Sequence, residues 1–397
     1  MKQLEIPTNL NLEDLLKIKY PEYTAHLEKF YYLIHMIRLK WFLDYSYKKL
    51  ERISKKTKKK LFIPLHNEHL RYILHPKYAK KILEILIDEN IIETNNHYKV
   101  GEYSKGYRLN ETYQHTDTKT YYLKDKILEN KIMKKEKEEN EAITDLNKQI
   151  LEMIKTRFTF DYENAFKLIT QQYHANIIEF KSFIRSFAQL KELEKGNIFI
   201  NESEKTGRIF HTYSNMKKDL RRYFIKHIRN DKLIEIDIAN SQPFFLGLLL
   251  SQLEPTADIN AYIDLVKNGN FYSFLQQELK IEESYDKLKE TILTMLYCPS
   301  YWNIKHKERF DEIFPSVSSV MKMIKAEDYK NLAIELQKLE ADMMIKTIAP
   351  ILLEKQIDFI PIHDSFIIEE RNKDIVIQII NDAFQDKYKL IPTLKIK

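Results

Sequence analysis

The sequence contains little cysteine, glycine or proline, and each shortage excludes a class of structure. Its single cysteine, Cys298, excludes an intramolecular disulfide and any metal site built from several cysteines. Only 6 glycines and 11 prolines occur among 397 residues, which argues against long flexible linkers. Hydrophobic residues make up 44% and charged residues 31%, as in ordinary globular proteins. This length and composition predict two or three domains with at least one large buried core.

Long hydrophobic runs are also absent. The most apolar stretch, Phe244 to Leu250, is too short to cross a bilayer, and Met1 to Leu10 lacks the apolar centre of a signal peptide. We therefore expect a cytoplasmic protein with no membrane partner.

The chain carries a mild excess of positive charge, which is unevenly distributed along the sequence. The net charge is +6, and the stretch from Lys55 to Lys60 concentrates positive charge. Such a run suits a surface that faces phosphates, and it equally suits the solvated end of a helix. Both interpretations stay open for this segment.

The N-terminal half divides into three predicted parts. Residues 1–60 form a helical segment, with a long helix expected over 22–54. Residues 61–110 predict two short helices, over 69–74 and 78–89, and then a β-hairpin that pairs 91–94 with 98–100 across an Asn-Asn turn. Residues 111–203 are predicted to be helical, with an exposed, highly charged stretch at 125–150.

The part over 61–110 resembles a winged-helix module. Its hairpin is expected to continue into a basic, aromatic tip that carries Lys105 and Arg108, which suits contact with a nucleic-acid backbone. A small structural domain or a protein-binding domain would show the same pattern. The sequence therefore leaves open whether Lys105 and Arg108 bind nucleic acid or belong to a domain with a structural or protein-binding role.

The C-terminal half mixes strands and helices. Residues 233–238 alternate as a strand that ends at an acid, Asp237, and residues 359–368 predict a hairpin with His363 and Asp364 at its turn. Helices are predicted over 284–296, 308–325 and 328–350. The two acids thus lie at the ends of strands that can be neighbours in one sheet.

Two such carboxylates suit phosphoryl transfer from a nucleoside triphosphate. That reaction needs cations between the attacking 3′-oxygen and the leaving pyrophosphate, and carboxylates to hold them. Mg²⁺ is commonly bound by one or two carboxylates with water and substrate phosphates. Asp237 and Asp364 are therefore predicted to be catalytic residues that hold two Mg²⁺ ions.

Residues 204–397 resemble the catalytic core of family A DNA polymerases, which the single-subunit, phage-type RNA polymerases share. Matching segments occur in the family's order, and any one alone is weak evidence. They are Thr206–Ile209, Asp237–Gln242 (motif A), Lys289–Tyr297 (motif B), Phe310–Pro315, Gln337 with Ala341 and Asp342, and His363–Ser365 (motif C). The resemblance implies an α+β polymerase right hand. Its antiparallel-sheet palm and reduced helical fingers would lie in 204–397, and a thumb-like region would lie in 111–203.

The resemblance also implies roles for individual residues. Lys289 would hold the triphosphate and protonate the departing pyrophosphate, and Tyr297 would pack on the incoming nucleotide from the same helix face. Three residues would contact the primer strand near its 3′ end: Arg208, Gln337 and His363.

The chain departs from the family pattern at motif B. Tyr285 replaces the usual arginine four residues before Lys289, so Lys287 is the candidate for that phosphate contact. The glycine that usually follows the motif B tyrosine is replaced by Cys298 and Pro299. No acidic exonuclease pattern precedes the core, so the resemblance implies a polymerase without proofreading.

The preferred sugar is left open. Gln242 falls where the DNA polymerases place a bulky Glu that crowds the 2′ position, and its size favours deoxynucleotides, although an amide can also hydrogen-bond a 2′-hydroxyl. The His-Asp-Ser form of motif C and Thr294 are more typical of the RNA polymerases.

Three functions are consistent with the sequence. The first is a small DNA polymerase that acts in the DNA replication of a mobile element, plasmid or phage, with a DNA or RNA template and primer and nucleoside triphosphates as partners. The second is a single-subunit RNA polymerase or primase. The third, of another class, is a DNA-binding replication initiator whose polymerase-like half is an inactive scaffold.

Overall fold

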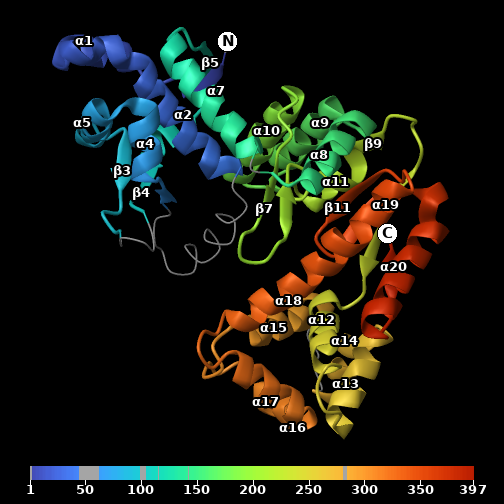
Figure 1. Cartoon of the computed structure of the whole chain (residues 1–397). Helices are drawn as coiled ribbons and strands as arrows, with labels where there is room; N and C mark the ends of the chain where they lie inside the picture. The colour runs from blue at the N-terminus through green and yellow to red at the C-terminus, as the bar shows by residue number, and fades with distance from the viewer. Residues whose placement is uncertain (1, 44–61, 99–103, 115, 142, 280–283) are drawn as a thin grey trace. The chain divides into compact units, whose positions relative to one another are not determined.

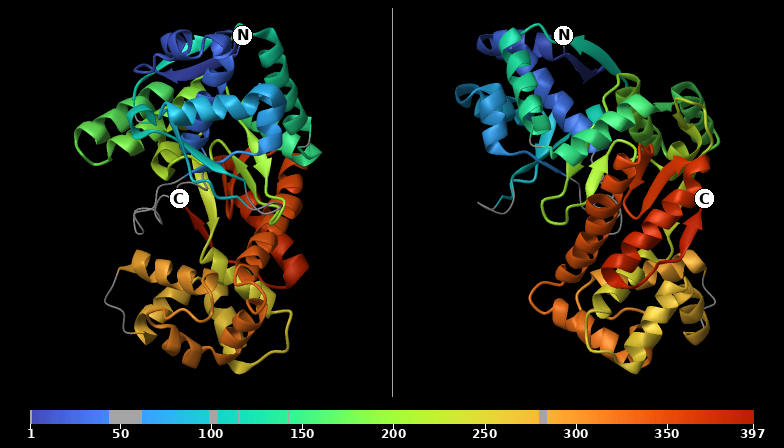
Figure 2. Two further views of the ribbon diagram at one scale, coloured as in Figure 1. Left: turned by 90° about the vertical axis from the view of Figure 1, so that its left-hand side faces the viewer. Right: turned by 45° about the vertical axis from the view of Figure 1, so that its right-hand side comes forward.

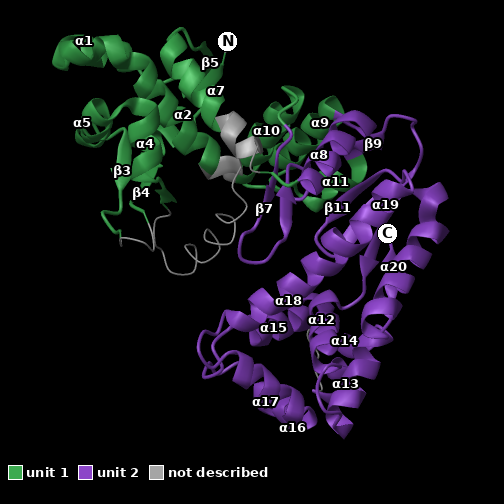
Figure 3. Cartoon of the chain, viewed as in Figure 1, with its two compact units in different colours: residues 1–144, 162–197, 215–223 green, residues 145–161, 198–214, 224–397 purple. Residues whose placement is uncertain are grey.

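The computed structural model describes residues 2–43, 62–98, 104–114, 116–141, 143–279 and 284–397 (Figure 1). The lysine run at 55–60 lies outside these ranges. The described residues form two compact units (Figure 3). Unit 1 comprises residues 1–144, 162–197 and 215–223, and unit 2 comprises residues 145–161, 198–214 and 224–397. No described helix is both long enough and apolar enough to cross a membrane.

Unit 1 is built around helix α2 (Leu27–Leu43), whose middle turns are buried. It packs against the strand pair β1 (Gln3–Pro7) and β5 (Thr118–Tyr122), and against α10 (Phe180–Glu194). The expected helix over 22–54 begins later than predicted, because Pro21–His26 forms a 3₁₀ turn before α2. Helices α7 (Lys126–Glu141) and α9 (Tyr162–His174) complete the helical part, with α1 (Leu12–Lys19) at the N-terminal end.

The segment over 61–110 contains the two predicted helices, α4 (Asn67–Leu74) and α5 (Pro76–Asp88). Its sheet differs from the prediction. Strand β3 (Ile92–Thr94) pairs with β4 (Gly106–Leu109), and β4 also pairs with β2 (Ile63–Pro64), which gives the order β2-β4-β3. The strand that pairs with β3 thus begins at Gly106, and residues 99–100 of the predicted partner segment lie outside the described ranges. The apolar side chains of this sheet join the same core as the N-terminal residues.

Unit 2 contains a four-stranded antiparallel sheet of order β11-β12-β10-β13. Strand β10 (Leu233–Ile238) lies between β12 (Ser365–Glu369) and β13 (Leu394–Ile396), and β11 (Phe359–Ile362) is at one edge. The strand predicted over 233–238 and the hairpin predicted over 359–368 are confirmed. Alternation along β10 buries Ile234, Ile236 and Ile238, and it turns Glu235 and Asp237 to the other face.

Some helices of unit 2 are connected directly to the four-stranded sheet, and others form a separate helical group. Helix α12 (Ser241–Leu250) follows β10 directly, and Phe384 of α20 (Lys373–Tyr388) packs its ring against Phe244 and Phe245 of α12. Helices α13 (Ala257–Lys267), α14 (Phe271–Glu278), α15 (Tyr285–Tyr297), α16 (Lys307–Ile313) and α17 (Pro315–Ile324) gather at one end of unit 2 (Figure 2). The helix predicted over 308–325 is broken at Pro315, which begins α17.

The helix predicted over 328–350 is continuous but not uniform. It begins as α18 (Asn331–Ala341), passes through a π-helical stretch at Asp342–Ile348 and ends as α19 (Ala349–Glu354). Helix α18 packs against both α12 and α15. Stretches of π-helix often lie at functional sites.

The smaller strand pairs of unit 2 complete the fold. Strand β7 (Ile200–Glu202) pairs with β8 (Ile209–His211), and β6 (Phe158–Phe160), which follows α8 (Asp145–Arg157), pairs with β9 (Ile225–His227). The short helix α6 (Glu111–Gln114) and α11 (Lys218–Phe224) up to Tyr223 belong to unit 1. Both units therefore mix helices with small antiparallel sheets.

Candidate active site

The two predicted catalytic acids lie close together, Asp237 on β10 and Asp364 in the turn just before the neighbouring strand β12. Asp237 of β10 is the cross-strand partner of Ser365 at the start of β12, and Asp364 immediately precedes Ser365. The backbone N–H of Ile238 donates to the carbonyl oxygen of Asp364 at 3.2 Å. The fold therefore brings together two acids that are far apart in the sequence.

Tight turns present both carboxylates. His363 and Asp364 form the two-residue loop between β11 and β12, and His363 takes a left-handed conformation with φ of 54°. After Asp237, the chain leaves β10 and turns into α12 at Asn240, which also has a left-handed φ, of 53°. Asparagine tolerates this conformation better than most residues do.

The surroundings of Asp364 disfavour its negative charge. Burial and, after it, the nearby charge of Asp237 raise the pKa of Asp364 to about 6, against smaller opposing effects of Ser241 and Arg208. A pair of acids that repel each other in this way is a favourable place for a cation.

A cationic side chain already lies at this pair. The Nζ of Lys397, at the end of β13, forms an ion pair with Asp237. The residues present therefore fit a divalent cation: carboxylate oxygens are hard ligands, and a positive charge is drawn to the site.

A chain of four polar side chains extends from the acids into the helices. Arg208 donates through Nη2 to Oε2 of Glu340 at 2.5 Å, and Gln242 donates through Nε2 to the same oxygen at 2.7 Å. The hydroxyl of Tyr297 donates to Oε1 of Gln242 at 2.7 Å. Glu340, a residue that the sequence analysis missed, thus joins Arg208 to Gln242, and Gln242 in turn contacts Tyr297.

Glu340 is buried, with 1% of its side chain exposed. Burial raises the pKa of Glu340 to about 7 and the charge of Asp364 contributes to the rise, whereas Arg208 and Gln242 lower it. Glu340 follows Gln337 by nearly one turn of α18, so the two lie on the same side of that helix. The signal that could have found Glu340 is its place one turn after Leu336 and one turn before Met344, both of which are buried.

The turn before β8 accounts for the glycine in the Thr206-Gly207-Arg208 segment. Gly207 has φ of 68°, and a Cβ added there would lie 3.7 Å from the Cβ of Ala341 and 3.5 Å from the Nζ of Lys346. This conformation favours glycine, and the turn lies against the end of α18. Arg208 is thereby directed towards Glu340.

The remaining predicted residues of unit 2 have less defined contacts. Lys289 and Lys287 are exposed on α15, and Lys289 lies about two turns before Tyr297. Gln337 is half-buried on α18. The His363 ring packs edge-to-face on Phe210 of β8, at 5.4 Å between centroids. The roles of these residues stay predictions.

Helix α15 ends just before Cys298 and Pro299, which stand where the polymerase pattern has a glycine. Buried Lys325 donates to the carbonyl oxygens of Met295 and Cys298, at 2.6 and 3.0 Å. A lysine at these positions satisfies carbonyl groups that a helix end leaves without intrahelical partners. The Cys298-Pro299 ending is therefore held without a glycine.

In unit 1, Lys105 and Arg108 have different settings. The Nζ of Lys105 lies 5.7 Å from the ring centroid of Tyr98. Arg108 does not lie at an exposed hairpin tip as predicted: it is buried in β4 and forms ion pairs with Glu111 at 3.1 Å and Glu93 at 4.0 Å. Because a strand rather than a loop carries Arg108, its guanidinium is engaged inside the module and not presented to a phosphate.

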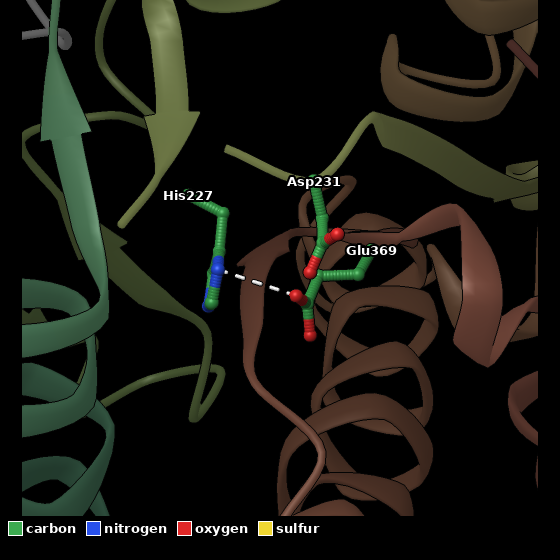
Figure 4. Close-up of side chains that lie close together, drawn as sticks. All are labelled: His227, Asp231 and Glu369. Atoms are coloured by element: carbon green, nitrogen blue, oxygen red, sulfur yellow. Dashed lines mark ion pairs between the residues drawn. The ribbon is translucent and has the colours of Figure 1, made fainter. Parts of the chain in front are cut away.

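A second cluster of possible metal ligands occurs in unit 2, at His227, Asp231 and Glu369 (Figure 4). Guanidinium groups already pair with its carboxylates. Arg229 contacts Glu369 at 2.6 Å and Asp231 at 3.6 Å, and Arg371 contacts Glu369 at 3.1 Å. Burial alone would raise the pKa of Glu369, but hydrogen bonds with Arg229, Asp231 and Arg371 prevail and lower it to about 2. The cluster is therefore a structural ion-pair network.

Comparisons with known proteins give distant structural likenesses only. No protein-family model matches the chain, and no curated protein matches it. Among solved structures, the polymerase domain of Pol1 from M. smegmatis, in complex with DNA primer-template and dNTP, is similar with a TM-score of 0.42 and 13% sequence identity. The match covers 60% of this chain and 55% of that one, so the chain spans about half the length of its solved neighbour.

Proposed function

We propose that the protein is a template-directed nucleotidyltransferase that extends a nucleic-acid 3′ end, with Asp237 and Asp364 as its catalytic acids. The observation that carries the proposal is that Asp237 on β10 lies beside Asp364 in the turn that leads into the neighbouring strand β12. The chain of Arg208, Glu340, Gln242 and Tyr297 lies next to them. A purely structural scaffold would not need repelling carboxylates at this place.

The residues divide the chemistry among them. Asp237 and Asp364 would hold two Mg²⁺ ions, which would stabilise charge on the transferring phosphoryl group. Lys289 would bind the triphosphate, aided by Lys287, and would supply a proton to pyrophosphate. Tyr297 and Gln242 would contact the nucleotide, and Arg208, Gln337 and His363 would contact the primer. Lys105 remains a candidate contact for nucleic acid.

Primer extension tests this function. Purified protein with Mg²⁺ is expected to extend a primer on a DNA or RNA template, with dNTPs or NTPs supplied in separate reactions. We favour a small DNA polymerase without proofreading. Extension with NTPs alone would favour the RNA polymerase or primase. Nucleic-acid binding without incorporation in any mixture would favour an inactive initiator and would contradict the proposal.

Replacing Gln242 by glycine is expected to admit ribonucleotides, because it removes the bulk predicted to crowd the 2′ position. Loss of such a contact should shift the ratio of kcat/KM for dNTP over NTP by about tenfold or more. Single-nucleotide incorporation with matched dNTP and NTP measures the ratio. An unchanged ratio would discard Gln242 as the residue that selects the sugar.

Replacing Lys397 by alanine is expected to lower the Mg²⁺ concentration for half-maximal extension, because the Lys397 ammonium competes with the metal for Asp237. A partly exposed ion pair contributes up to about 1 kcal/mol, so its loss should lower this Mg²⁺ concentration by about two- to fivefold. Lys355→Ala is the matched control: it removes the same charge from an exposed position that precedes β11. An equal shift in both variants would indicate a general charge effect instead.

A further inference from the structure

The hydrogen bonds of Glu340 differ from those of a carboxylate that only pairs with an arginine. A carboxylate that only neutralises an arginine commonly uses both oxygens in a forked pair. Here Arg208 and Gln242 both donate to Oε2, while Oε1 of Glu340 and Nε of Arg208 have no hydrogen-bond partner within the part of the chain that the structure describes. One oxygen thus joins the arginine to a side chain at the predicted nucleotide site.

This contact determines which way the Gln242 amide points. The NH₂ group of Gln242 faces Glu340, because Nε2 donates to Oε2 of this carboxyl group at 2.7 Å. The amide oxygen then faces Tyr297, whose hydroxyl must donate. Hydrogen bonds run in one direction, from Tyr297 to Gln242 to Glu340, and both ends of the amide are held.

We propose that Glu340 is a positioning residue for sugar selection: it fixes Gln242 against the 2′ position of the incoming nucleotide. This inference rests on the proposed function. A held amide must break a hydrogen bond before it can move aside for a 2′-hydroxyl or turn to bind it. A released amide can do either. Without Glu340, discrimination against ribonucleotides falls even though Gln242 is still present.

Two variants of equal size separate this role from a structural one. Glu340→Met and Glu340→Gln both remove the charge beside Arg208, but only Gln retains an oxygen that can accept from Gln242. Single-turnover incorporation of matched dNTP and NTP gives the discrimination ratio. The ratio should fall about tenfold in Glu340→Met and stay within about twofold of wild type in Glu340→Gln.

Two further variants complete the design. Tyr297→Phe leaves Glu340 and its ion pair in place and releases the other end of the amide, so it should also lower the ratio, by about threefold. Adding Glu340→Met to Gln242→Gly should cause no further fall, because the two act on one group. Glu335→Ala, on the same helix with a half-exposed side chain, is the control and should leave the ratio unchanged.

The outcomes distinguish this inference from the function on which it rests. If wild type incorporates nucleotides and Glu340→Met slows dNTP and NTP incorporation equally, Glu340 is only structural and the inference is overturned. An equal fall in the ratio for Glu340→Met and Glu340→Gln overturns it as well, because acceptance from Gln242 is then not what matters. If wild type incorporates neither nucleotide, the proposed function fails and the inference fails with it.

Discussion

Replacing Asp364 by alanine is expected to reduce primer extension by about 10³-fold or more. Metal ions contribute several kcal/mol of transition-state stabilisation in such reactions, and loss of about 4 kcal/mol corresponds to this factor. Asp237→Ala should have an effect of the same order, because the two acids are expected to hold the same ions. Single-turnover extension at saturating nucleotide measures the loss.

The same substitution should not unfold the protein. The pKa of Asp364 is raised to about 6 from its ordinary value of 3.8, so ionisation of this carboxyl at neutral pH costs folding free energy. Asp364→Ala and Asp364→Asn should therefore keep the melting temperature at pH 7 or raise it. Asp386→Ala, at an exposed position of α20, is the control and should keep full activity. Extension by Asp364→Ala within tenfold of wild type would contradict the catalytic role.

Replacing Glu369 by alanine is expected to destabilise unit 2 by about 2–4 kcal/mol. Its side chain is fully buried and accepts from Arg229 and Arg371, so truncation leaves two guanidinium groups without their shared partner. Removing one partner of a buried ion pair costs about 3–5 kcal/mol, and the half-exposed arginines reduce that figure. Equilibrium denaturation at pH 7 measures the free energy of unfolding.

The neighbouring residue supplies a matched control. Glu370 pairs with Lys232 at 2.7 Å, but both side chains are exposed, so Glu370→Ala should cost about 1 kcal/mol or less. Equal destabilisation by the two variants would show that the network around Glu369 contributes nothing special.

The stabilisation from Glu369 should depend on pH. Its pKa is lowered to about 2 in the folded protein from an ordinary value of 4.5, so its contribution is fully present above about pH 4.5 and is lost as pH falls towards 2. Glu369→Gln should flatten the acid limb of the stability curve. An unchanged acid limb would indicate that other carboxyl groups cause the acid sensitivity.

The parts of the fold that sequence could predict are those with strong local periodicity. The strand over 233–238 alternates apolar and polar residues, and the hairpin over 359–368 has its polar pair at a two-residue turn. These two patterns also placed Asp237 and Asp364. That the strands are neighbours could be expected only from the resemblance, because no local pattern specifies which strands pair.

The errors have equally local causes. Residues 98–100 and 106–109 both resemble strands, and sequence alone could not show that Ile92–Thr94 pairs with the later one. Arg108 resembled a surface residue because arginine is rarely buried, and its partners Glu93 and Glu111 come together only in the folded module.

Glu340 shows what sequence reasoning missed in the site. A glutamate beside Lys338 resembles the exposed face of a helix, yet helical spacing places it in line with buried Leu336 and Met344. Its partners Arg208 and Gln242 come from segments more than ninety residues away, at separations of 132 and 98. Only the folded chain shows that they share one carboxylate oxygen.

The binding of Mn²⁺, followed by electron paramagnetic resonance, tests the central claim most directly. The sample is the full chain with a primer-template whose primer ends in a dideoxynucleotide and with a matching dNTP, so that chemistry cannot proceed. Wild type is predicted to hold two Mn²⁺ ions per protein, at least one more than the nucleic acid and dNTP bind alone, because the dNTP triphosphate itself binds one. Asp237→Asn and Asp364→Asn should each lose at least one. Equal Mn²⁺ binding by wild type and both variants would contradict the claim that these two carboxylates hold the catalytic metals.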